Sequence, residues 1–321
     1  MTFYSNIYSD NKSIILNRFG NLMIRIDKNK HPCIIAMVNG GLGSQMWQFA
    51  LGYCASLESG LPVKYDISWF NDDGMDINGI YKRNFNITNV FSNIPFEVAS
   101  DHDIRFYKKY FYRYNKRLCF YNKDLIVSKS PRYLGSYYQN YRYFDNAAED
   151  LRKILKFSEH LLSDNNAYIS AQIKSCTCPV AVHIRRGDYV NSLFDVTKPD
   201  YFHQSVNLMK EKLGRSSPVF FIFSNDIDYS RTILNNIEGR FVFVDVNNND
   251  NGEHDMALMS QCRHYIISNS SFSWWPAWLA EDKDKIVICP DRWFNDDAPE
   301  SYKDGNKTAM NCTGWIALPA D

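Results

Sequence analysis

A chain of 321 residues is longer than one small hydrophobic core requires and suggests two domains of about 150 residues each. The formal net charge is +0, so no overall field attracts nucleic acid or an anionic membrane, and we expect no nucleic-acid partner. The 8 cysteines form no CxxC pair, which disfavours a zinc site or a disulfide framework and is typical of reduced thiols in the cytoplasm. The N-terminus lacks a signal-peptide pattern, and no apolar run approaches the roughly 18–20 residues of a membrane span.

The first half of the chain opens with polar, weakly patterned residues 1–32, which we interpret as a peripheral extension. The apolar run CIIAMV at 33–38 predicts a buried strand, NGGLGSQ a glycine-rich turn, and residues 46–60 a helix. Such a turn lets the backbone approach a ligand closely, with N–H groups available at the helix start. The loop residues that we expect near a ligand cleft are Gly40, Gly41, Gly43 and Gln45.

The middle of the chain is less regular. Segment 105–122, RFYKKYFYRYNKRLCFYN, is basic and aromatic together, a combination that can bind single-stranded nucleic acid. Because the whole chain is neutral, we favour a helix with a solvated Lys/Arg face and a packed aromatic face. A further helix is predicted over 141–157. The polar stretch 163–172 predicts a boundary between a first domain, 1–165, and a second domain, 166–321.

The second half has a clear alternation of strands and helices. Apolar runs typical of buried strands occur at 180–184, 219–224, 241–246, 265–268 and 285–289. Helical segments lie between them, near 199–213, 228–237, 253–263 and 272–282. Five strands alternating with four helices predict an α/β fold with a doubly wound parallel sheet and right-handed crossovers.

The stretch PVAVHIRRGDYV, residues 179–190, sets charged side chains at the end of a buried strand. Because side chains alternate along a strand, His183 and Arg185 share one face and Arg186 points to the other. Gly187 allows a sharp turn at the strand end, where ligands bind in open α/β sheets. A guanidinium holds a phosphate bidentately, so the arginines predict a phosphorylated ligand, with ion pairs at a domain interface as the alternative.

A serine-rich segment, NSSFSWWPAWL at 269–279, follows the predicted strand at 265–268. The residues that begin its helix are Asn269, Ser270, Ser271 and Ser273. Their N–H groups and hydroxyls suit an anion or an ordinary N-cap, and the two roles are compatible. Pro276 is tolerated if the helix has only just begun. Asp255, in the first turn of the preceding helix, can accept hydrogen bonds from a base or a ribose. The residues assigned to the core are Met256, Met259, Trp274, Trp275 and Trp278.

The segment FSNDID contains a DxD pair, Asp226 and Asp228, directly after a strand. This arrangement holds a divalent metal on a nucleotide diphosphate in one class of glycosyltransferases. The chain has two further DxD pairs, at 101–103 and 282–284, so the pattern arises here by chance. We interpret Asp226 as a loop residue near a nucleotide and Asp228 as a helix cap, and we predict no metal site.

Segments 40–53, 183–190 and 255–279, in this order and spacing, resemble the α-1,2-fucosyltransferases of glycosyltransferase family 11. Segment 133–144 is similar to the family more loosely. The resemblance implies a GT-B fold, in which two Rossmann-like domains face a cleft. It also implies GDP-L-fucose as donor, inversion at the anomeric carbon and no required metal or other cofactor.

The resemblance places the β-phosphate contact on Arg185, guanine or ribose contacts on His183 and Asp255, and phosphate contacts on Ser270 and Ser271. The donor-binding residues that we expect are His183, Arg185, Arg186, Asp226, Asp255, Asn269, Ser270, Ser271 and Phe272. The first domain would supply the acceptor site. Ser44 and Trp47 stand where the family usually has Asn and Phe.

The catalytic residues that we expect are Arg185, on the leaving diphosphate, and Asp188, as the general base. Related α-1,6-fucosyltransferases carry a glutamate base where this chain has Leu193, so the resemblance assigns no base. Asp188 follows the arginines past the Gly187 turn and can face the cleft. A salt bridge between Asp188 and Arg186 is the alternative role, and Asp195 is the alternative base.

The resulting prediction is an inverting α-1,2-fucosyltransferase that moves L-fucose from GDP-β-L-fucose to O2 of a terminal galactose in a glycan. The alternatives are transfer to another hydroxyl or from another GDP-sugar, and a glycan- or nucleotide-binding module without turnover. The expected partners are GDP-L-fucose and a β-galactoside. We expect a cytoplasmic protein, which a lipid-linked acceptor would bring to the inner face of the cytoplasmic membrane.

Overall fold

The computed structural model describes residues 32–72, 74–75, 79, 81–113, 119–248, 251–303, 307 and 309–321, and the backbone alone of 7–9, 12–16 and 23–27. The predicted extension over 1–32 therefore lies largely outside the described residues. Its described parts are β1 (Ile7–Ser9), β2 (Lys12–Leu16) and β3 (Met23–Asp27), which form an antiparallel sheet of their own. Among the described helices, none is long and apolar enough to cross a membrane.

The first half contains a parallel sheet of four strands in the order β5-β4-β7-β6. The strands are β4 (Ile34–Met37), β5 (Val63–Asp66), β6 (Tyr112–Arg113) and β7 (Arg132–Leu134). The helices of this half are α1 (Leu42–Ser59), α2 (Ser68–Asp72), α3 (Ile87–Val90), α4 (Asp101–Tyr110), α5 (Asp124–Val127) and α6 (Ala148–Ile154). The order of the strands reverses between β4 and β7, so a crevice opens at their carboxyl ends, where the GGLG loop follows β4.

The second half contains a parallel sheet of six strands in the order β10-β9-β8-β11-β12-β13. The strands are β8 (Pro179–Ile184), β9 (Val219–Ser224), β10 (Arg240–Phe243), β11 (His264–Ile266), β12 (Val287–Pro290) and β13 (Ile316–Leu318). The helices are α7 (Asn165–Ser175), α8 (Pro199–Leu213), α9 (Ile227–Leu234), α10 (Gly252–Met259), α11 (Ser271–Leu279) and α12 (Glu300–Lys303). This strand order is that of the Rossmann fold, with its switch point between β8 and β11. The predicted doubly wound α/β sheet is confirmed.

Three expectations about single elements were wrong or incomplete. The sixth strand, β13, was missed because it is only 3 residues long and half-buried. The helix predicted over 141–157 is two 3-10 turns followed by α6, and the Tyr141 N–H donates to the carbonyl of Ala309 in the other half. Pro276 is the sixth residue of α11 and lies beyond its first turn.

The basic and aromatic segment 105–122 is described up to residue 113 and again from residue 119. Within α4 and just after it, Tyr107 and Phe111 are buried, whereas Lys108 and Lys109 are exposed. This confirms the interpretation of a packed aromatic face and a solvated cationic face for residues 105–110, whereas Tyr112 lies in β6 and is exposed.

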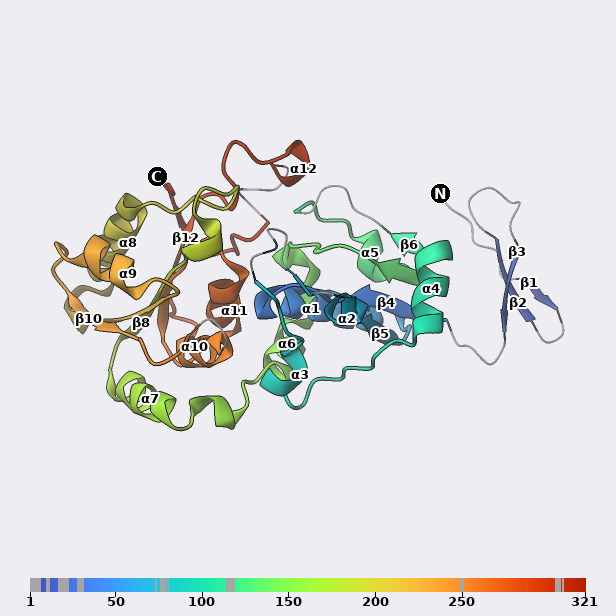
Figure 1. Cartoon of the computed structure of the whole chain (residues 1–321), viewed down its shortest axis with the longest axis horizontal. Coiled ribbons are helices and arrows are strands. Elements are labelled where there is room, and N and C mark those ends of the chain that lie inside the picture. Colours follow the sequence, from blue (N-terminus) through green and yellow to red (C-terminus); the bar gives the residue numbers. More distant parts are fainter. Residues whose placement is uncertain are drawn as a thin grey trace.

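The two halves meet where α1 and α11 lie side by side (Figure 1), and an aromatic core fills this contact. Trp47 of α1 packs on Trp274 and Trp275 of α11, with ring centroids 4.4 and 5.3 Å apart. The indole N–H of Trp275 donates to the carbonyl of Gly43 over 2.9 Å. The predicted core role of the tryptophans is confirmed, and their packing sets the distance between the starts of the two helices. The predicted domain boundary near residue 165 falls at the start of α7, between the two sheets.

Candidate active site

A cavity of about 910 Å³ lies at the carboxyl ends of both sheets. Its walls include the loops after β4 and β7 in the first half, and the loops after β8, β9, β10, β11 and β12 in the second. Both switch points therefore open into the same space, which is where ligands bind in folds of this type. This is the arrangement of two Rossmann-like halves around a cleft that the sequence predicted.

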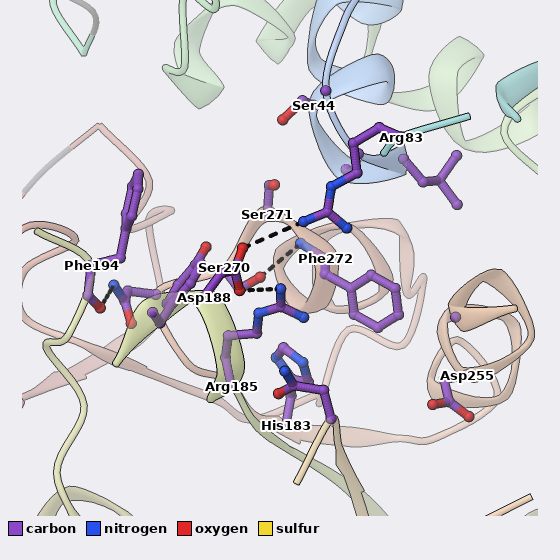
Figure 2. Close-up of a pocket in the computed structure, with 18 of the residues that line it drawn as sticks. Ser44, Arg83, His183, Arg185, Asp188, Phe194, Asp255, Ser270, Ser271 and Phe272 are labelled. Carbon is purple, nitrogen blue, oxygen red and sulfur yellow. Dashed lines mark hydrogen bonds and ion pairs between the residues drawn. The ribbon is translucent and has the colours of Figure 1, made fainter. Parts of the chain in front are cut away.

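His183 and Arg185 line the cavity from the end of β8. Ser268, at the end of β11, ties the two strands together: its hydroxyl accepts from the Arg185 N–H over 3.1 Å and donates to the His183 carbonyl over 2.6 Å. His183 Nδ1 lies 2.9 Å from the hydroxyl of Ser273. These bonds fix the His183 ring and the backbone of Arg185 at the switch point, and Figure 2 shows where the two side chains lie.

The imidazole of His183 is neutral. Burial, with a contribution from the Arg185 guanidinium, lowers its pKa to about 3. The Ser268 hydroxyl donates to the His183 carbonyl, and the Ser273 hydroxyl donates to the Ser270 carbonyl. Because both hydroxyl protons are used in this way, we assign the ring proton of His183 to Nδ1, which donates to these hydroxyls. Nε2 therefore keeps its lone pair. A neutral imidazole of this kind accepts a hydrogen bond but is a poor general base.

Arg185 and Asp188 form an ion pair within the loop that follows β8. The Arg185 guanidinium also lies over the ring of Tyr189, 5.3 Å from its centroid. The other carboxylate oxygen of Asp188 is 3.4 Å from Arg83, a residue of the first half. The side chains of Arg83, Arg185 and Asp188 are 25%, 18% and 13% exposed, and all three line the cavity.

The sharp turn at Gly187 makes this arrangement possible. Gly187 has φ +62°, and a Cβ atom there would collide with the side chain of Asn225. Asn225 in turn accepts the N–H of Arg186 over 2.9 Å. The salt bridge that we suggested between Asp188 and Arg186 is wrong, because Asp188 pairs with Arg185 and Arg83.

Arg186 points away from the cavity. Its guanidinium lies over the Tyr229 ring, 4.0 Å from the centroid, and Arg186 is absent from the cavity wall. The alternation of side chains along the strand explains this position, and the structure does not bring Arg186 to the expected donor site. Asp195, the alternative base, pairs with Lys198 over 2.7 Å and also lies outside the cavity wall.

The start of α11 forms the centre of the cavity wall, as the serine-rich segment predicted. Ser270 is the N-cap, and its hydroxyl accepts from the Phe272 N–H over 3.3 Å. Asn269 donates to the carbonyls of Phe194 and Trp293, each over 2.9 Å, and so holds two wall loops in place. The cap and the available N–H groups beside it are compatible with an anion at this helix start.

The start of α1 meets the start of α11 at the cavity. A Cβ atom on Gly43 would lie only 2.6 Å from the Ser271 hydroxyl, so only glycine permits this approach. Gly40 and Gly41 line the cavity, as expected. Gln45 does not: its amide donates to the carbonyls of Gly40 and Asn84, and it is buried as a brace of the loop.

At one end of the cavity, Asp255 projects from α10 near the ring of Phe272 (Figure 2). Burial raises the pKa of Asp255 to about 6, and the carboxylate accepts from the Asn247 side chain over 2.7 Å. The His183 and Phe272 rings lie 5.3 Å apart between centroids. A carboxylate beside an aromatic ring suits the polar edge and the flat face of a purine.

The helix cap of the DxD segment is Asp226, not Asp228 as we expected. Asp226 is the N-cap of α9 and accepts from the Tyr229 N–H over 3.0 Å, whereas Asp228 lies in the first turn. Both line the cavity. Within the described part of the chain, no group of three or more His, Cys, Asp or Glu side chains is arranged to hold a metal ion.

Several residues of the cavity wall were not found from the sequence. They are Trp69, Lys82, Arg83, Tyr137, Asn247, Trp293 and Tyr302. Most come from irregular loops, where no periodicity indicates which side chains turn inward. Arg83 is the most consequential of them because it contacts Asp188 across the cavity.

Comparison with known proteins gives a consistent result. The model of glycosyl transferase family 11 matches residues 83–318. The chain is 33% identical over 288 residues to an alpha-1,2-colitosyltransferase of Escherichia coli, across 84% of this chain and 95% of that protein. It is 28% identical over 315 residues to the O-antigen biosynthesis glycosyltransferase WbnK of Escherichia coli, across 88% and 99%.

More distant similarities are also found. The galactoside alpha-(1,2)-fucosyltransferase 2 of Rattus norvegicus is 27% identical over 192 residues, across 57% of this chain and 52% of that protein. The crystal structure of fucosyltransferase NodZ from Bradyrhizobium covers 77% of this chain and 93% of its own, with 14% identity and a TM-score of 0.43. Because the family model spans most of the sequence and a 33% identical relative covers most of it too, the chain belongs to glycosyltransferase family 11.

Proposed function

We propose that the chain is an inverting α-1,2-fucosyltransferase that moves L-fucose from GDP-β-L-fucose to O2 of a terminal β-galactoside. Family membership and relatives named as α-1,2-fucosyl- and α-1,2-colitosyltransferases support the type of linkage. The observation that carries the proposal is the convergence of Arg185, the start of α11 and Asp255 on one cavity at the switch point of the second sheet.

The donor nucleotide would occupy the end of the cavity that contains Asp255. An ionised Asp255 accepts hydrogen bonds from guanine N–H groups or ribose hydroxyls, while the Phe272 ring offers an apolar face. His183, neutral and with a lone pair on Nε2, accepts from a further donor of the nucleotide. The diphosphate would then lie at Arg185 and the helix start.

The rate of the transfer step depends mainly on how well the leaving diphosphate is stabilised. When the bond between fucose and the diphosphate breaks, the electron pair goes to a phosphate oxygen and positive charge develops on the sugar ring. Arg185 and the N–H groups and hydroxyls of Ser270 and Ser271 stabilise the departing GDP without reorganisation. We propose that these groups suffice and that no metal is required.

The acceptor would approach from the opposite face of the sugar, as inversion demands. Aromatic side chains from both halves line the cavity: Trp69, Tyr137, Phe194, Trp293, Phe294 and Tyr302. Such rings give apolar faces on which a hexose can pack. The acceptor site that we expected from the first half alone is thus proposed to be shared by the two halves.

Asp188 is the candidate base that removes the proton from the galactose hydroxyl. Asp188 has both oxygens in contact with guanidinium groups, those of Arg185 and Arg83. Each carboxylate oxygen has a second lone pair, so these contacts and a role as base are compatible. We propose that Asp188 first of all orients the two arginines, and that its role as base is decided by the Asp188→Asn variant.

One assay tests the proposed function. The purified protein is given GDP-L-fucose with a β-galactoside such as lactose, and the linkage of the product is determined by NMR. A fucosyl-α-1,2-galactose product is expected. Transfer to another hydroxyl would refute the linkage, and GDP binding without transfer would favour a binding module. Failure to bind GDP at all would refute the whole proposal.

Colitosyl transfer is a second candidate because an alpha-1,2-colitosyltransferase is 33% identical to this chain. Colitose is fucose without the 3-hydroxyl, so the same diphosphate site would serve both donors. The ratio of kcat/KM for GDP-fucose and GDP-colitose distinguishes the two candidates. An O-antigen relative supports a surface-glycan precursor as acceptor, and we propose that the protein acts in the cytoplasm, at the membrane face when that precursor is lipid-linked.

A further inference from the structure

Arg83 reaches the cavity from the first half and is held there by its neighbours. Its backbone N–H donates to the carbonyl of Gly74 over 2.8 Å, next to a bridge that pairs Met75 with Lys82. Its guanidinium lies over the Tyr81 ring, 5.1 Å from the centroid. A side chain constrained at both its backbone and its head group presents its N–H donors in one direction at little entropic cost.

Asp188 aligns Arg83 with Arg185. One carboxylate oxygen contacts Arg185 and the other is 3.4 Å from Arg83, so each guanidinium has its own oxygen of the same carboxylate (Figure 2). Together, the side chains of Arg83, Arg185 and Asp188 carry a formal net charge of +1 in a partly buried part of the cavity wall. Each guanidinium has five N–H donors in a planar fork, a geometry that suits phosphate oxygens.

We propose that Arg83 is a second cationic ligand of the donor diphosphate, supplied by the first half of the chain and positioned by Asp188. This inference rests on the proposed function. An anion that reaches Arg185 also meets Arg83, because both contact the same carboxylate and both line the same cavity. Since the terminal phosphate takes up the electron pair when fucose departs, two guanidiniums there stabilise the leaving group better than one.

This assignment has a consequence for how the two halves cooperate. Arg185 belongs to the second sheet, whereas Arg83 belongs to the loops of the first. A donor bound by both spans the cavity and ties the halves together at the diphosphate, in addition to the aromatic core between α1 and α11. A simple interface salt bridge, in contrast, would hold the halves together equally well without a nucleotide.

The test compares GDP with GMP, which lacks the terminal phosphate. Affinities are measured by isothermal titration calorimetry for the wild type, Arg83→Met and Arg83→Lys. The matched control is Arg263→Met, because Arg263 forms a 2.7 Å ion pair with Asp282 away from the cavity wall. We expect Arg83→Met to weaken GDP binding about 10–100-fold, as expected for the loss of hydrogen bonds to a charged group, and GMP binding by less than about 2-fold. Arg83→Lys should recover part of the loss, and the control should match the wild type.

A double-mutant cycle tests the positioning by Asp188. We compare the loss of GDP affinity caused by Arg83→Met in two backgrounds. In Asp188→Asn this loss should be at least about 5-fold smaller than in the wild type, because Arg83 is no longer aligned. Unchanged GDP affinity in a folded Arg83→Met protein, equal losses for GDP and GMP, or additive effects in the cycle would each overturn the inference. If the wild type binds no GDP, the proposed function fails and this inference fails with it.

Discussion

Replacement of Arg185 by Ala is the sharpest test of the donor site. Its side chain is 18% exposed, pairs with Asp188 and lies over Tyr189, so the guanidinium works in a largely desolvated place. Loss of one preorganised charge stabiliser of a leaving group lowers turnover by about 10²–10³-fold, or about 2.7–4 kcal/mol. Loss of hydrogen bonds to a charged ligand costs about 1.5–3 kcal/mol, which weakens GDP affinity about 10–150-fold.

The measurement combines steady-state kinetics with calorimetric titration of GDP. Circular dichroism of the variant first establishes that the protein is folded, because the substitution also leaves Asp188 with Arg83 as its ion-pair partner. Arg263→Ala serves as the control for removal of an ion-paired arginine elsewhere on the chain. A folded Arg185→Ala protein with turnover and GDP affinity close to the wild type would refute the assignment of the diphosphate to this strand end.

The other predictions concern the base, the metal, the nucleotide and the packing of the halves. Asp188→Asn should lower GDP affinity and transfer together if the carboxylate orients arginines; a fall in transfer of about 10²-fold or more at unchanged GDP affinity would instead identify it as the general base. Activity should survive exhaustive chelation with EDTA, and complete loss that Mg²⁺ restores would contradict metal-independent transfer. Because burial raises the pKa of Asp255 to about 6, its ionised, hydrogen-bond-accepting form grows about tenfold from pH 5 to 7, and GDP affinity should rise with it. The phosphate of GDP titrates in the same range (about 6), so only the part of the rise that Asp255→Asn abolishes tests the carboxylate. Gly43→Ala should destabilise the protein by about 1–3 kcal/mol in urea unfolding, since its Cβ would lie 2.6 Å from the Ser271 hydroxyl, whereas Gly41→Ala, with no atom within 4 Å of its Cβ, should be neutral.

The sequence predicts the second half well because its signals are local. Charged residues at the end of an otherwise apolar run identify the end of β8, and a serine followed by an apolar helix identifies the N-cap at Ser270. The alternation of side chains along the strand separated Arg185 from Arg186 correctly. Arg186 was included among the donor residues because two adjacent guanidiniums suit a phosphate, and that argument ran against the alternation rule.

The parts that were missed depend on contacts between distant segments. Arg83 lies in a stretch without periodicity, and its pairing with Asp188 follows only from the way the halves meet. Gln45 was assigned to the ligand because it follows the glycine turn, but its amide satisfies backbone groups of residues 84–87. The cap assigned to Asp228 belongs to Asp226, since either carboxylate fits the pattern and only the backbone angles show where α9 begins.

The packing between α1 and α11 connects these observations. Each helix starts at the carboxyl end of its sheet, and the Trp47 cluster with the Trp275–Gly43 hydrogen bond holds the two starts in contact. The centre of the cavity is thus built on rigid elements, which is what charge stabilisation of a leaving diphosphate needs. The aromatic walls, in contrast, belong to loops and to the short helices α2 and α12, whose sequences can change without disturbing that centre. If the proposed diphosphate site is correct, this division explains how relatives named for fucose and for colitose can share it.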